Sequence, residues 1–502
     1  MSKKSRILCL FIVILFSANF AAGCMNSSVG PYYSQASSES KKDYDICIYN
    51  ARYDVSEMLQ KLLDEYYSEN GVKIKVISPS KENDSFEKLN SQLNSYEYPT
   101  IYSITNLKEL ANLQHDGFAW NFDDSNIDEF KELTKNIPEN MKLSLKDSGN
   151  FGIPYGIDGY GYLVDRGMIA SIFGENIADS FISNLKYATY DEFEALVKAL
   201  DSFIKNNQAS YVYLNSNEYL ISSKKDDISK NLTGVFSVAG AEEWTYINHM
   251  INVAMNTTFD SSLNAFNASK SQLDLLYNPL KAYSKSLDLK TFYAAGENGQ
   301  LERSASYIDP EKSSYEQSLK NFSDGKSIFI KQGNWVYNEI ERINPQLASR
   351  LNIIPVKMPF SKDDIHLSKS IDELNKSIPV YVSMYYGINA KTSDKEKKLA
   401  QDFLVWLNTS DLGRKYIVDE FKYIPYDCDD NFESIYSINK AILGYKKAGT
   451  ILSGVYMGSP YCGKSSALGE KIKNEYLTKK TWTDKDYDDI AKFAIEQWKI
   501  NK

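Results

Sequence analysis

The sequence predicts an α/β fold with more than one core. Asp43–Tyr49 is a short strand-like run, residues 55–66 carry apolar side chains at helical spacing, and Val72–Ile77 alternates apolar and polar residues. A strand, a helix and a second strand in this order predict a right-handed βαβ unit and a parallel sheet. The chain has 502 residues, which is long enough for two sizeable cores.

The elements that follow keep alternating. We expect a helix over Phe86–Leu93, a strand over Thr100–Ile104 and a helix through Leu107 and Leu113. Helical patterns continue from a capping box at Thr189 to about residue 285. Beyond them we expect two strands and a helix that begins with another capping box, at Ser327–Lys331, Pro379–Ile388 and Ser393 to Glu396.

The stretch Phe151–Gly167 is dense in glycine and aromatic residues. Tyr160, Tyr162 and Val164 recur at every second position, which predicts a strand with these side chains on one face. Its glycines leave room for another backbone or a ligand to approach closely. Two interpretations stay open: an ordinary core strand, or a strand that crosses between two lobes with Asp158 facing a cleft.

The N-terminus has the pattern of a secretion signal. Lys3, Lys4 and Arg6 precede an apolar run that is too short to span a membrane, and small residues lead directly to Cys24. This ending resembles a bacterial lipobox, in which the cysteine receives lipid and becomes the mature N-terminus. We therefore expect a lipoprotein signal peptide at 1–23 and a lipidated Cys24 with a Ser-rich flexible tether at 24–42. Ordinary secretion without lipid is the alternative.

Charge and rare residues exclude several classes of function. Loss of the signal peptide changes the formal net charge from −9 to −12, which argues against nucleic acid as a partner. Beyond Cys24 the cysteines are Cys47, Cys428 and Cys462, without close metal-ligand spacing, and the three histidines are isolated. We expect no metal site, no cofactor and no His-based triad. A bridge between Cys428 and Cys462 cannot be decided from sequence.

Three segments resemble the extracellular solute-binding proteins of bacterial ABC sugar importers, the class that includes maltose-binding protein. They read GIPYGIDGYGYLVDRG, FSDGKSIFIKQGNWVY and YYGINAKTSDKEKKLAQDFLVWLNTSDLGRKYI. The first is similar to the family's G-x-P-Y segment and the strand after it. The second is similar to F-x-x-G-K-x-A-F-x-x-x-G-x-W, with Ile328 at the usual alanine. The third is similar to G-I followed by S-x-K-x-K-x-x-A-x-x-F-L-x-W-L, and the order of the three also fits.

The resemblance implies a two-lobe α/β clamp of the periplasmic-binding-protein type, each lobe a sheet flanked by helices, with a ligand cleft between the lobes. The expected N-terminal lobe is 43–157 plus 379–419, and the expected C-terminal lobe is 158–378 plus 420–502. The implied function is capture of a carbohydrate, in particular an oligosaccharide, outside the cell and delivery to membrane permease subunits. We expect a lipid-anchored monomer that is not an enzyme.

The resemblance also suggests ligand-binding residues. Trp335 matches the family tryptophan that stacks on a sugar ring. Loop position alone suggests a second group of polar contacts and one late aromatic residue, namely Asp158, Asn50, Arg52, Asn106 and Tyr461. Sugars present C–H faces and hydroxyl edges, so a binder needs aromatic planes together with amides, carboxylates or arginine. On this chemistry Trp244 and Tyr160 are further stacking candidates and Asn334 is a further hydrogen-bonding candidate. Asn50 or Asp54 could equally serve as a helix N-cap, and tryptophan is common in cores.

Two other functions are compatible with parts of the sequence. A secreted carbohydrate-active enzyme would need two carboxylates held about 5–10 Å apart, and no pair stands in a recognisable catalytic context. A binder of a ferric complex could use adjacent tyrosines such as Tyr385 and Tyr386, although iron would favour a more basic cleft. A structural lipoprotein would not explain the three ordered segments.

Overall fold

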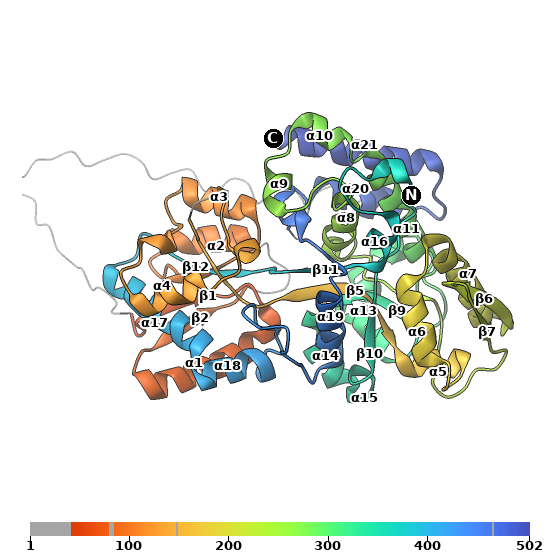
Figure 1. Ribbon diagram of the computed structural model, residues 1–502, viewed down its shortest axis with the longest axis horizontal. Coiled ribbons are helices and arrows are strands. Elements are labelled where there is room, and N and C mark those ends of the chain that lie inside the picture. Colours follow the sequence, from red (N-terminus) through yellow and green to blue (C-terminus); the bar gives the residue numbers. More distant parts are fainter. Residues whose placement is uncertain (1–41, 80–84, 147–148, 464–465) are drawn as a thin grey trace, which may run out of the picture. The chain divides into compact units, whose positions relative to one another are not determined.

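Two β-sheets, each flanked by helices, organise the computed structural model of this protein (Figure 1). The structure describes residues 42–79, 85–146, 149–463 and 466–502, and Asp43–Lys502 form one compact unit. The α/β class predicted from the sequence is confirmed. The signal peptide, Cys24 and nearly all of the predicted tether lie outside the described residues. Within the described part, no helix is long and apolar enough to cross a membrane.

The first sheet has five strands in the order β2-β1-β3-β12-β4. Strand β1 (Ile46–Tyr49) lies parallel to β2 (Ile74–Ile77) and to β3 (Ile101–Ile104), as the predicted βαβ unit requires. Strand β12 (Tyr385–Ile388) joins antiparallel to β3, and β4 (Ile153–Pro154) lies at the edge, where the missing N–H of proline is tolerated. The helices that accompany this sheet are α1 Ser56–Asn70, α2 Ser85–Leu93, α3 Leu107–His115, α4 Asp128–Lys135, α17 Asp394–Thr409 and α18 Asp411–Lys415.

The second sheet has six strands, in the order β13-β11-β5-β9-β8 with β10 also paired to β5. Its central strand is β5 (Asp158–Asp165), which runs antiparallel to β9, β10 and β11. The other members are β8 Phe236–Ser237, β9 Phe329–Gly333, β10 Leu351–Ile354, β11 Ile378–Tyr381 and β13 Ile451–Leu452.

Most helices of the chain belong to the part that carries the second sheet (Figure 1). The capping boxes predicted at Thr189 and Ser393 are both present, at the starts of α7 and α17. The remaining helices are α5 Arg166–Phe173, α6 Ala178–Tyr187, α7 Tyr190–Asn206, α8 Asn248–Met255, α9 Ser262–Phe266, α10 Lys270–Asp274, α11 Tyr277–Phe292, α12 Pro310–Ser313, α13 Tyr315–Ser323, α14 Tyr337–Ile343, α15 Pro345–Ala348, α16 Ile371–Lys376, α19 Ser437–Lys447, α20 Ala467–Lys471 and α21 Asp484–Ile500.

A hairpin interrupts the stretch for which helical patterns are predicted up to residue 285. Strands β6 (Ser210–Leu214) and β7 (Asn217–Ile221) pair antiparallel through a two-residue turn. Asn215 and Ser216 both have positive φ, 48° and 65°, as a hairpin turn of this length requires. The expectation of helical patterns up to about residue 285 is therefore wrong over 210–221, where buried and exposed side chains alternate as in strands.

The chain passes between the two sheets at neighbouring places. Three residues, 155–157, separate β4 in the first sheet from β5 in the second, and 382–384 separate β11 from β12. A third segment lies alongside the first, since Ile157 and Ile424 form a β-bridge. Strand β11 is part of the second sheet, although the predicted N-terminal lobe resumes at 379. The lobe boundaries stay a prediction.

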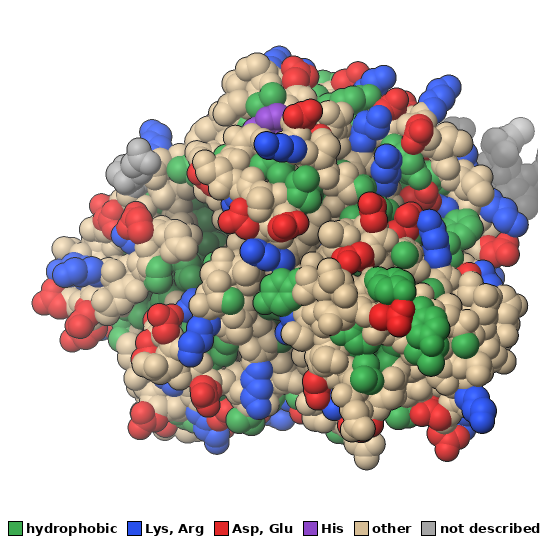
Figure 2. Space-filling view, turned by 45° about the vertical axis from the view of Figure 1, so that its right-hand side comes forward, with side chains coloured by type: hydrophobic (Ala, Val, Ile, Leu, Met, Phe, Trp, Pro, Cys, Tyr) green, Lys and Arg blue, Asp and Glu red, His purple; other side chains and the backbone are tan. Residues whose placement is uncertain are grey.

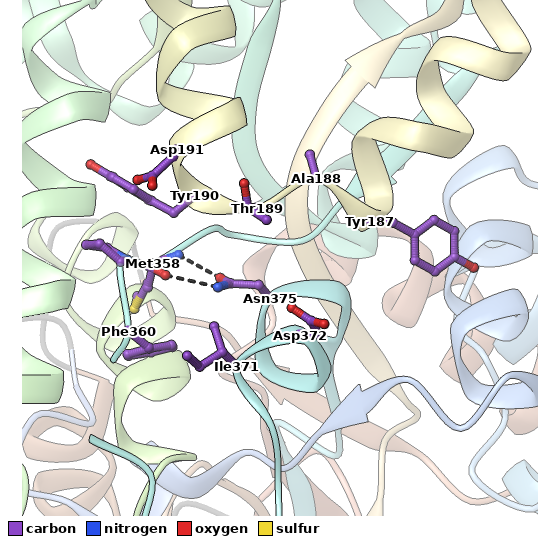
Figure 3. A pocket seen from close by; sticks show the side chains of 11 residues that line it. Tyr187, Ala188, Thr189, Tyr190, Asp191, Met358, Phe360, Ile371, Asp372 and Asn375 are labelled. Carbon is purple, nitrogen blue, oxygen red and sulfur yellow. Dashed lines mark hydrogen bonds between the residues drawn. The ribbon is translucent and has the colours of Figure 1, made fainter. Parts of the chain in front are cut away.

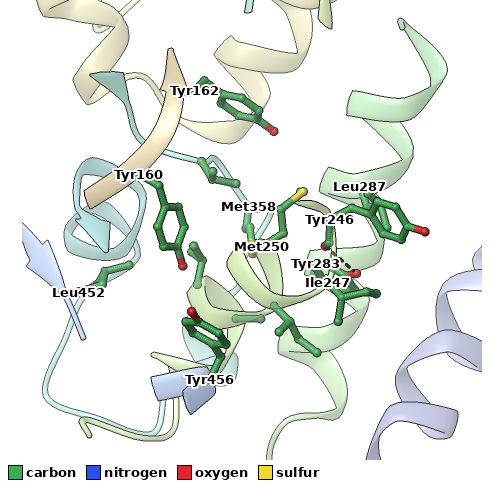
Figure 4. Packing of buried hydrophobic residues seen from close by; sticks show 14 of the residues in the cluster. Tyr160, Tyr162, Tyr246, Ile247, Met250, Tyr283, Leu287, Met358, Leu452 and Tyr456 are labelled. Atoms are coloured by element: carbon green, nitrogen blue, oxygen red, sulfur yellow. Dashed lines mark hydrogen bonds between the residues drawn. The ribbon is translucent and has the colours of Figure 1, made fainter. Parts of the chain in front are cut away.

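Strand β5 has the alternation that the sequence predicts. Tyr160, Tyr162 and Val164 pack into one hydrophobic cluster, and Leu163 packs into the other. Figure 4 shows Tyr160 and Tyr162 on the same side of the strand, with Tyr456 opposite Tyr160. A methyl group at Gly161 would collide with the Ile354 carbonyl oxygen of the paired strand. This glycine therefore serves close strand packing rather than ligand approach.

Candidate functional site

Four rings from three separate stretches of the chain meet in one place, which we call the aromatic cluster: Tyr160, Trp244, His249 and Trp335. His249 lies at its centre, with ring centroids 4.5 Å from Tyr160, 4.9 Å from Trp335 and 5.6 Å from Trp244. Tyr160 and His249 are buried, whereas both indoles are partly exposed. The structure therefore brings the three predicted stacking residues together, around a histidine that was not predicted.

Local backbone geometry orients the Trp335 indole. Strand β9 ends at Gly333, and a short 3-10 helix, Asn334–Val336, follows. The indole folds back onto the strand end, and a methyl group at Gly333 would collide with its ring. The indole Nε1 donates to Gln332 Oε1 at 2.9 Å. Glycine at 333 is thus required for the position of Trp335.

The side chain of Asn334, a predicted ligand contact, is hydrogen-bonded to strand β5 and to the residue before it. Its Oδ1 accepts from Gly159 N at 3.1 Å, and its Nδ2 donates to the Ile157 carbonyl at 3.2 Å. Asn334 therefore ties the turn that carries Trp335 to the segment that crosses between the sheets. Its role in ligand binding stays a prediction.

A second group, the crossing network, consists of Arg52, Asp54, Asp158, Ser383 and Tyr423. Arg52 makes two bonds to Asp54, at 2.9 and 2.8 Å, and its Nη1 lies 3.4 Å from Asp158 Oδ2. Ser383 donates to the same Asp158 oxygen. The guanidinium also lies over the Tyr423 ring, 4.7 Å from its centroid. These residues come from the loop after β1 and from the three segments near the sheet crossings.

Burial dominates the electrostatics of the crossing network. Arg52 is 6% exposed and Asp158 is 4% exposed. Burial raises the pKa of Asp158 above its ordinary value, and the Arg52 charge and the Ser383 hydroxyl oppose the rise only in part. Burial also acts to lower the pKa of Arg52, but Asp54 and its other partners raise it well above the usual range. The guanidinium stays charged and its bonds are used within the protein.

Asn50 organises the loop after β1. Its Oδ1 accepts from Arg52 N and its Nδ2 donates to the Arg52 carbonyl, at 3.1 and 2.7 Å, and the residue is fully buried. Neither Asn50 nor Asp54 is the N-cap of α1, because Val55 occupies that position. Asn50 therefore holds the backbone that presents Arg52.

The structure places the other two predicted residues outside the aromatic cluster. Asn106 is the N-cap of α3, where its Oδ1 accepts from Glu109 N at 2.9 Å. Tyr461 is 2% exposed, donates to the Ala494 carbonyl and packs edge-on against Trp498. The residues next to them in the sequence are in contact, since Cys462 Sγ lies 4.0 Å from the Thr105 carbonyl oxygen. Ligand contact by either residue stays a prediction.

Acidic side chains gather beside Trp244. The Trp244 ring is 5.4 Å from Tyr315, whose hydroxyl lies 3.5 Å from Glu339 Oε1. Tyr53 belongs to the same neighbourhood: burial raises the pKa of its phenol, and a group of nearby carboxylates adds to the rise, namely Glu339, Asp54, Glu316 and Glu242. Several carboxylates therefore lie near Tyr53 on this side of the aromatic cluster. On the face shown in Figure 2, acidic and basic side chains are interspersed.

Among the described residues, the structure forms neither the disulfide nor the shared tyrosine site that the sequence left open. Cys428 and Cys462 are both free thiols, so the possible bridge between them is absent from the described chain. Tyr385 and Tyr386 are neighbours on β12 and pack into different hydrophobic clusters. Tyr386 stacks on Tyr155 with centroids 3.6 Å apart. These two phenols cannot jointly bind one ferric ion, because successive side chains of a strand point to opposite faces.

Surface hollows also lie elsewhere in the part with the second sheet, among them two that adjoin each other. One, of about 330 Å³, lies between the α6–α7 connection and residues 358–375 (Figure 3). Two hydrogen bonds between Met358 and Asn375 close its floor, at 2.8 and 3.0 Å. The other, of about 420 Å³, adjoins it beside Tyr190 and Tyr293. No predicted site residue lines either hollow.

The unpredicted members of the site are His249 and Lys331. Lys331 is 3% exposed on β9, and its amine lies 2.6 Å from His249 Nδ1. An isolated histidine carries no local motif, and its neighbours Tyr160, Lys331 and Trp335 come from distant segments. Lys331 did carry a signal, because it follows the apolar run Ile328–Ile330 within a strand. A lysine at such a position is buried with a partner or marks the end of the strand.

The aromatic cluster has the chemistry of a sugar-binding surface. The indoles supply flat apolar planes with exposed area, and His249 supplies a polar edge between them. In the crossing network, by contrast, the charged side chains form ion pairs with one another. The arrangement of the aromatic cluster therefore favours binding of a ligand.

Comparison with known proteins gives the family. Residues 61–426, well over half of the chain, match the family model described as bacterial extracellular solute-binding protein. No curated protein sequence matches the chain.

Solved structures share the fold at low sequence identity. RafE in complex with raffinose aligns with a TM-score of 0.60 and 16% identity, over 90% of this chain and 98% of that one. A Streptococcus pneumoniae solute-binding protein in complex with the blood group A-trisaccharide aligns with a TM-score of 0.56 and 16% identity, over 90% of this chain and 98% of that one. A protein from work on xylan utilization by Caldanaerobius polysaccharolyticus aligns with a TM-score of 0.56 and 14% identity, over 91% of this chain and 100% of that one. The predicted two-lobe solute-binding fold is confirmed.

Proposed function

Because this chain belongs to the bacterial extracellular solute-binding proteins, we propose that it captures a carbohydrate outside the cell and delivers it to an ABC permease. One observation carries the choice of carbohydrate: two partly exposed indoles, Trp244 and Trp335, meet at His249. Stacked aromatic planes suit the C–H faces of sugar rings. The sugars named for several structural neighbours support the same class of ligand.

The proposed ligand position lies between the two sheet-bearing parts. Trp335 and Trp244 belong to the part with the second sheet, and the loop after β1 brings Tyr53 and Arg52 from the first. A ligand that contacts both parts stabilises the closed arrangement in proportion to its differential affinity. The predicted ranges 43–157 plus 379–419 and 158–378 plus 420–502 remain our proposal for the two lobes.

Asp158 is proposed to brace the crossing rather than to bind sugar. Its carboxylate already accepts from Arg52 and Ser383, and it is 4% exposed. Breaking such bonds to reach a ligand would leave buried charge uncompensated. Asn334, bonded to the same crossing segment, shares this role.

A ligand screen tests the proposed function. Thermal unfolding is measured with mono- and oligosaccharides, among them raffinose, chitin oligosaccharides, xylan fragments and acarbose. A sugar present at one hundred times its Kd should stabilise the protein by about 2.7 kcal/mol. Stabilisation by a ferric complex and by no sugar would contradict the proposal.

The same samples test whether the protein acts on its ligand. We propose that the sugar is bound and released unchanged by a monomer that needs no cofactor. Prolonged incubation should leave the stabilising oligosaccharide intact by chromatography. Cleavage products that depend on the protein would show an enzyme instead.

Lipid attachment at Cys24 is proposed from its lipobox-like context. The chain would then stand outside the cytoplasmic membrane beside its permease, held by the Ser-rich residues that follow. In a Cys24→Ser variant the membrane-bound fraction should fall sharply, because one signal for anchoring is lost. An unchanged membrane fraction would refute the anchor without affecting the ligand proposal.

A further inference from the structure

His249 is a buried polar group that the sugar-stacking scheme leaves unused. It lies near the start of α8, and its backbone carbonyl accepts from the Tyr160 hydroxyl at 2.8 Å. The imidazole has contacts on several sides, including the Tyr456 ring at 6.0 Å in addition to Tyr160 and the two indoles. The ring is therefore held in a definite place within the aromatic cluster.

One of its two ring nitrogens is taken. The Lys331 amine lies 2.6 Å from Nδ1, within hydrogen-bond distance. Nε2 makes no hydrogen bond to any residue that the structure describes, although the residue is 7% exposed. A neutral imidazole offers one donor and one acceptor, so the bond to Lys331 commits Nδ1 and leaves Nε2 for another partner.

The neighbours of His249 favour an uncharged ring. Burial lowers the pKa of His249 well below its ordinary value, and Lys331 and Lys290 lower it further. The other titratable groups that face it are the phenols of Tyr160 and Tyr456. Both lysines are buried, at 3% and 2% exposed. A neutral Nε2 suits a hydroxyl, which can donate or accept.

We propose that His249 is a specificity-determining contact of the ligand site, where Nε2 bonds a hydroxyl of a sugar stacked on Trp244 or Trp335. Lys331 is the positioning residue, which holds the imidazole through Nδ1. The inference rests on the proposed function. His249 would distinguish between ligands at the place where the two indoles meet. A ligand that lacks a hydroxyl there would leave Nε2 without a partner.

The positioning role can be tested without any ligand. In ¹⁵N-histidine-labelled protein only three imidazoles contribute, and His115 and His366 are exposed; His115→Gln and His366→Gln variants assign their signals. The His249 nitrogens should report one fixed neutral tautomer from about pH 5.5 to about pH 8. Lys331→Met should release Nδ1 and change the tautomer ratio, and Lys331→Gln, which keeps a donor, should restore it.

Lys357 provides the matched control. It is also a fully buried lysine of the same part of the chain, but its amine donates to the Lys186 and Asn375 carbonyls, both at 2.7 Å. Lys357→Met should leave the His249 nitrogens unchanged, whatever its effect on stability. An unchanged His249 tautomer in Lys331→Met would overturn the positioning role.

The contact role is tested with sugar probes. Raffinose, a chitin oligosaccharide, a xylan-derived oligosaccharide and acarbose are titrated into the labelled protein, and the sugar that binds should shift the His249 Nε2 signal. His249→Phe should weaken that sugar about threefold to tenfold, the loss of one hydrogen bond. His249→Gln, which can bond both Lys331 and a hydroxyl, should retain more of the affinity.

Each result of the titration has a definite meaning. Saturation by a sugar without movement of the Nε2 signal would overturn the contact, even if His249→Phe fails to fold. Equal affinity of His249→Phe and wild type would do the same. If no sugar in the panel binds, the proposed function fails and the contact fails with it, while the tautomer experiment still decides the role of Lys331.

Discussion

The aromatic cluster and the crossing network differ in how fully their polar groups are bonded within the protein. In the crossing network, Arg52 bonds Asp54 twice and Asp158 once while it lies over Tyr423. In the aromatic cluster, two indoles keep exposed surface and His249 has one nitrogen without a bond to any described residue. A group that has used its bonds internally stabilises the protein, and a group with spare surface and spare bonding capacity is suited to a ligand.

The difference matters because both groups contain residues of the kinds that bind sugars. Arginine and aspartate recognise hydroxyls well when they are accessible, and each charge-assisted bond contributes roughly 1.5–3 kcal/mol. Burial removes that accessibility from Arg52 and Asp158. Substitutions in the two groups should therefore affect different properties, stability in one and ligand affinity in the other.

Arg52→Met should have the largest effect. It leaves Asp54 and Asp158 without their shared cation, and loss of one partner from a buried ion pair costs about 3–5 kcal/mol in the free energy of unfolding. Urea unfolding measures the change. Arg166→Met is the matched control, because Arg166 bonds Asp179 and Glu175 at the surface, where pairs are worth no more than about 1 kcal/mol. Equal losses of unfolding free energy in Arg52→Met and Arg166→Met would show that the buried network contributes no more than a surface ion pair.

Trp335→Ala should act mainly on binding. Loss of a stacked indole should weaken the sugar found in the thermal screen by about 2 kcal/mol, as for a binding hot spot. Calorimetry gives the affinity. Trp406→Ala serves as the control, since Trp406 is also partly exposed but packs on Tyr66 and Phe403 beside the first sheet. Unchanged affinity in Trp335→Ala would remove this residue from the site.

Acid should destabilise the protein through His249. The folded state keeps the imidazole neutral, whereas the unfolded chain takes up a proton near pH 6.5, so the unfolded state binds more protons below that pH. The free energy of unfolding should fall as pH drops below about 6.5, by up to about 1.4 kcal/mol per unit. Urea unfolding over this range should show a shallower slope for His249→Phe and an unchanged slope for His115→Gln. The same slope in all three would contradict the assignment.

Tyr160→Phe should have the smallest effect. It removes the hydroxyl that donates to the His249 carbonyl and keeps the ring, so about 1 kcal/mol of unfolding free energy should be lost. Sugar affinity should change by less than in Trp335→Ala, because the indoles stay in place. A loss of affinity as large as that of Trp335→Ala would mean that the Tyr160 hydroxyl itself meets the ligand.

Much of the fold followed from local patterns. The alternation of Tyr160, Tyr162 and Val164, the capping boxes at Thr189 and Ser393, and the parallel β1–β2 pair are properties of short windows of sequence. The β6–β7 hairpin was missed, since a turn made of Asn215 and Ser216 is a weak signal beside long helical spacing.

The candidate site was predictable only in part, for the same reason. Trp335 belonged to a recognisable segment, and Trp244 and Tyr160 were named as aromatic planes. Tyr160 and Trp335 meet His249 from 89 and 86 positions away in the sequence, whereas Trp244 lies only five residues before it. Asn106 and Asn50 stood at strand ends, where a ligand contact and a backbone contact use the same side chain. The hydrogen bond from Glu109 N shows that Asn106 caps α3, and the bond from Arg52 N shows that Asn50 holds the loop after β1.

By itself the sequence determined the α/β class, much of the order of the elements, the resemblance to solute-binding proteins and the candidate status of Trp335, because local periodicity and short motifs encode these. It missed the β6–β7 hairpin and the break of the strand expected at Pro379–Ile388 into β11 and β12. The tertiary structure alone decided that Asp158 and Arg52 are buried together, that Asn334 holds the crossing strand, and that Lys331 occupies one nitrogen of His249. Burial and hydrogen-bond partners depend on which distant segments pack together. No short window of the chain contains that information.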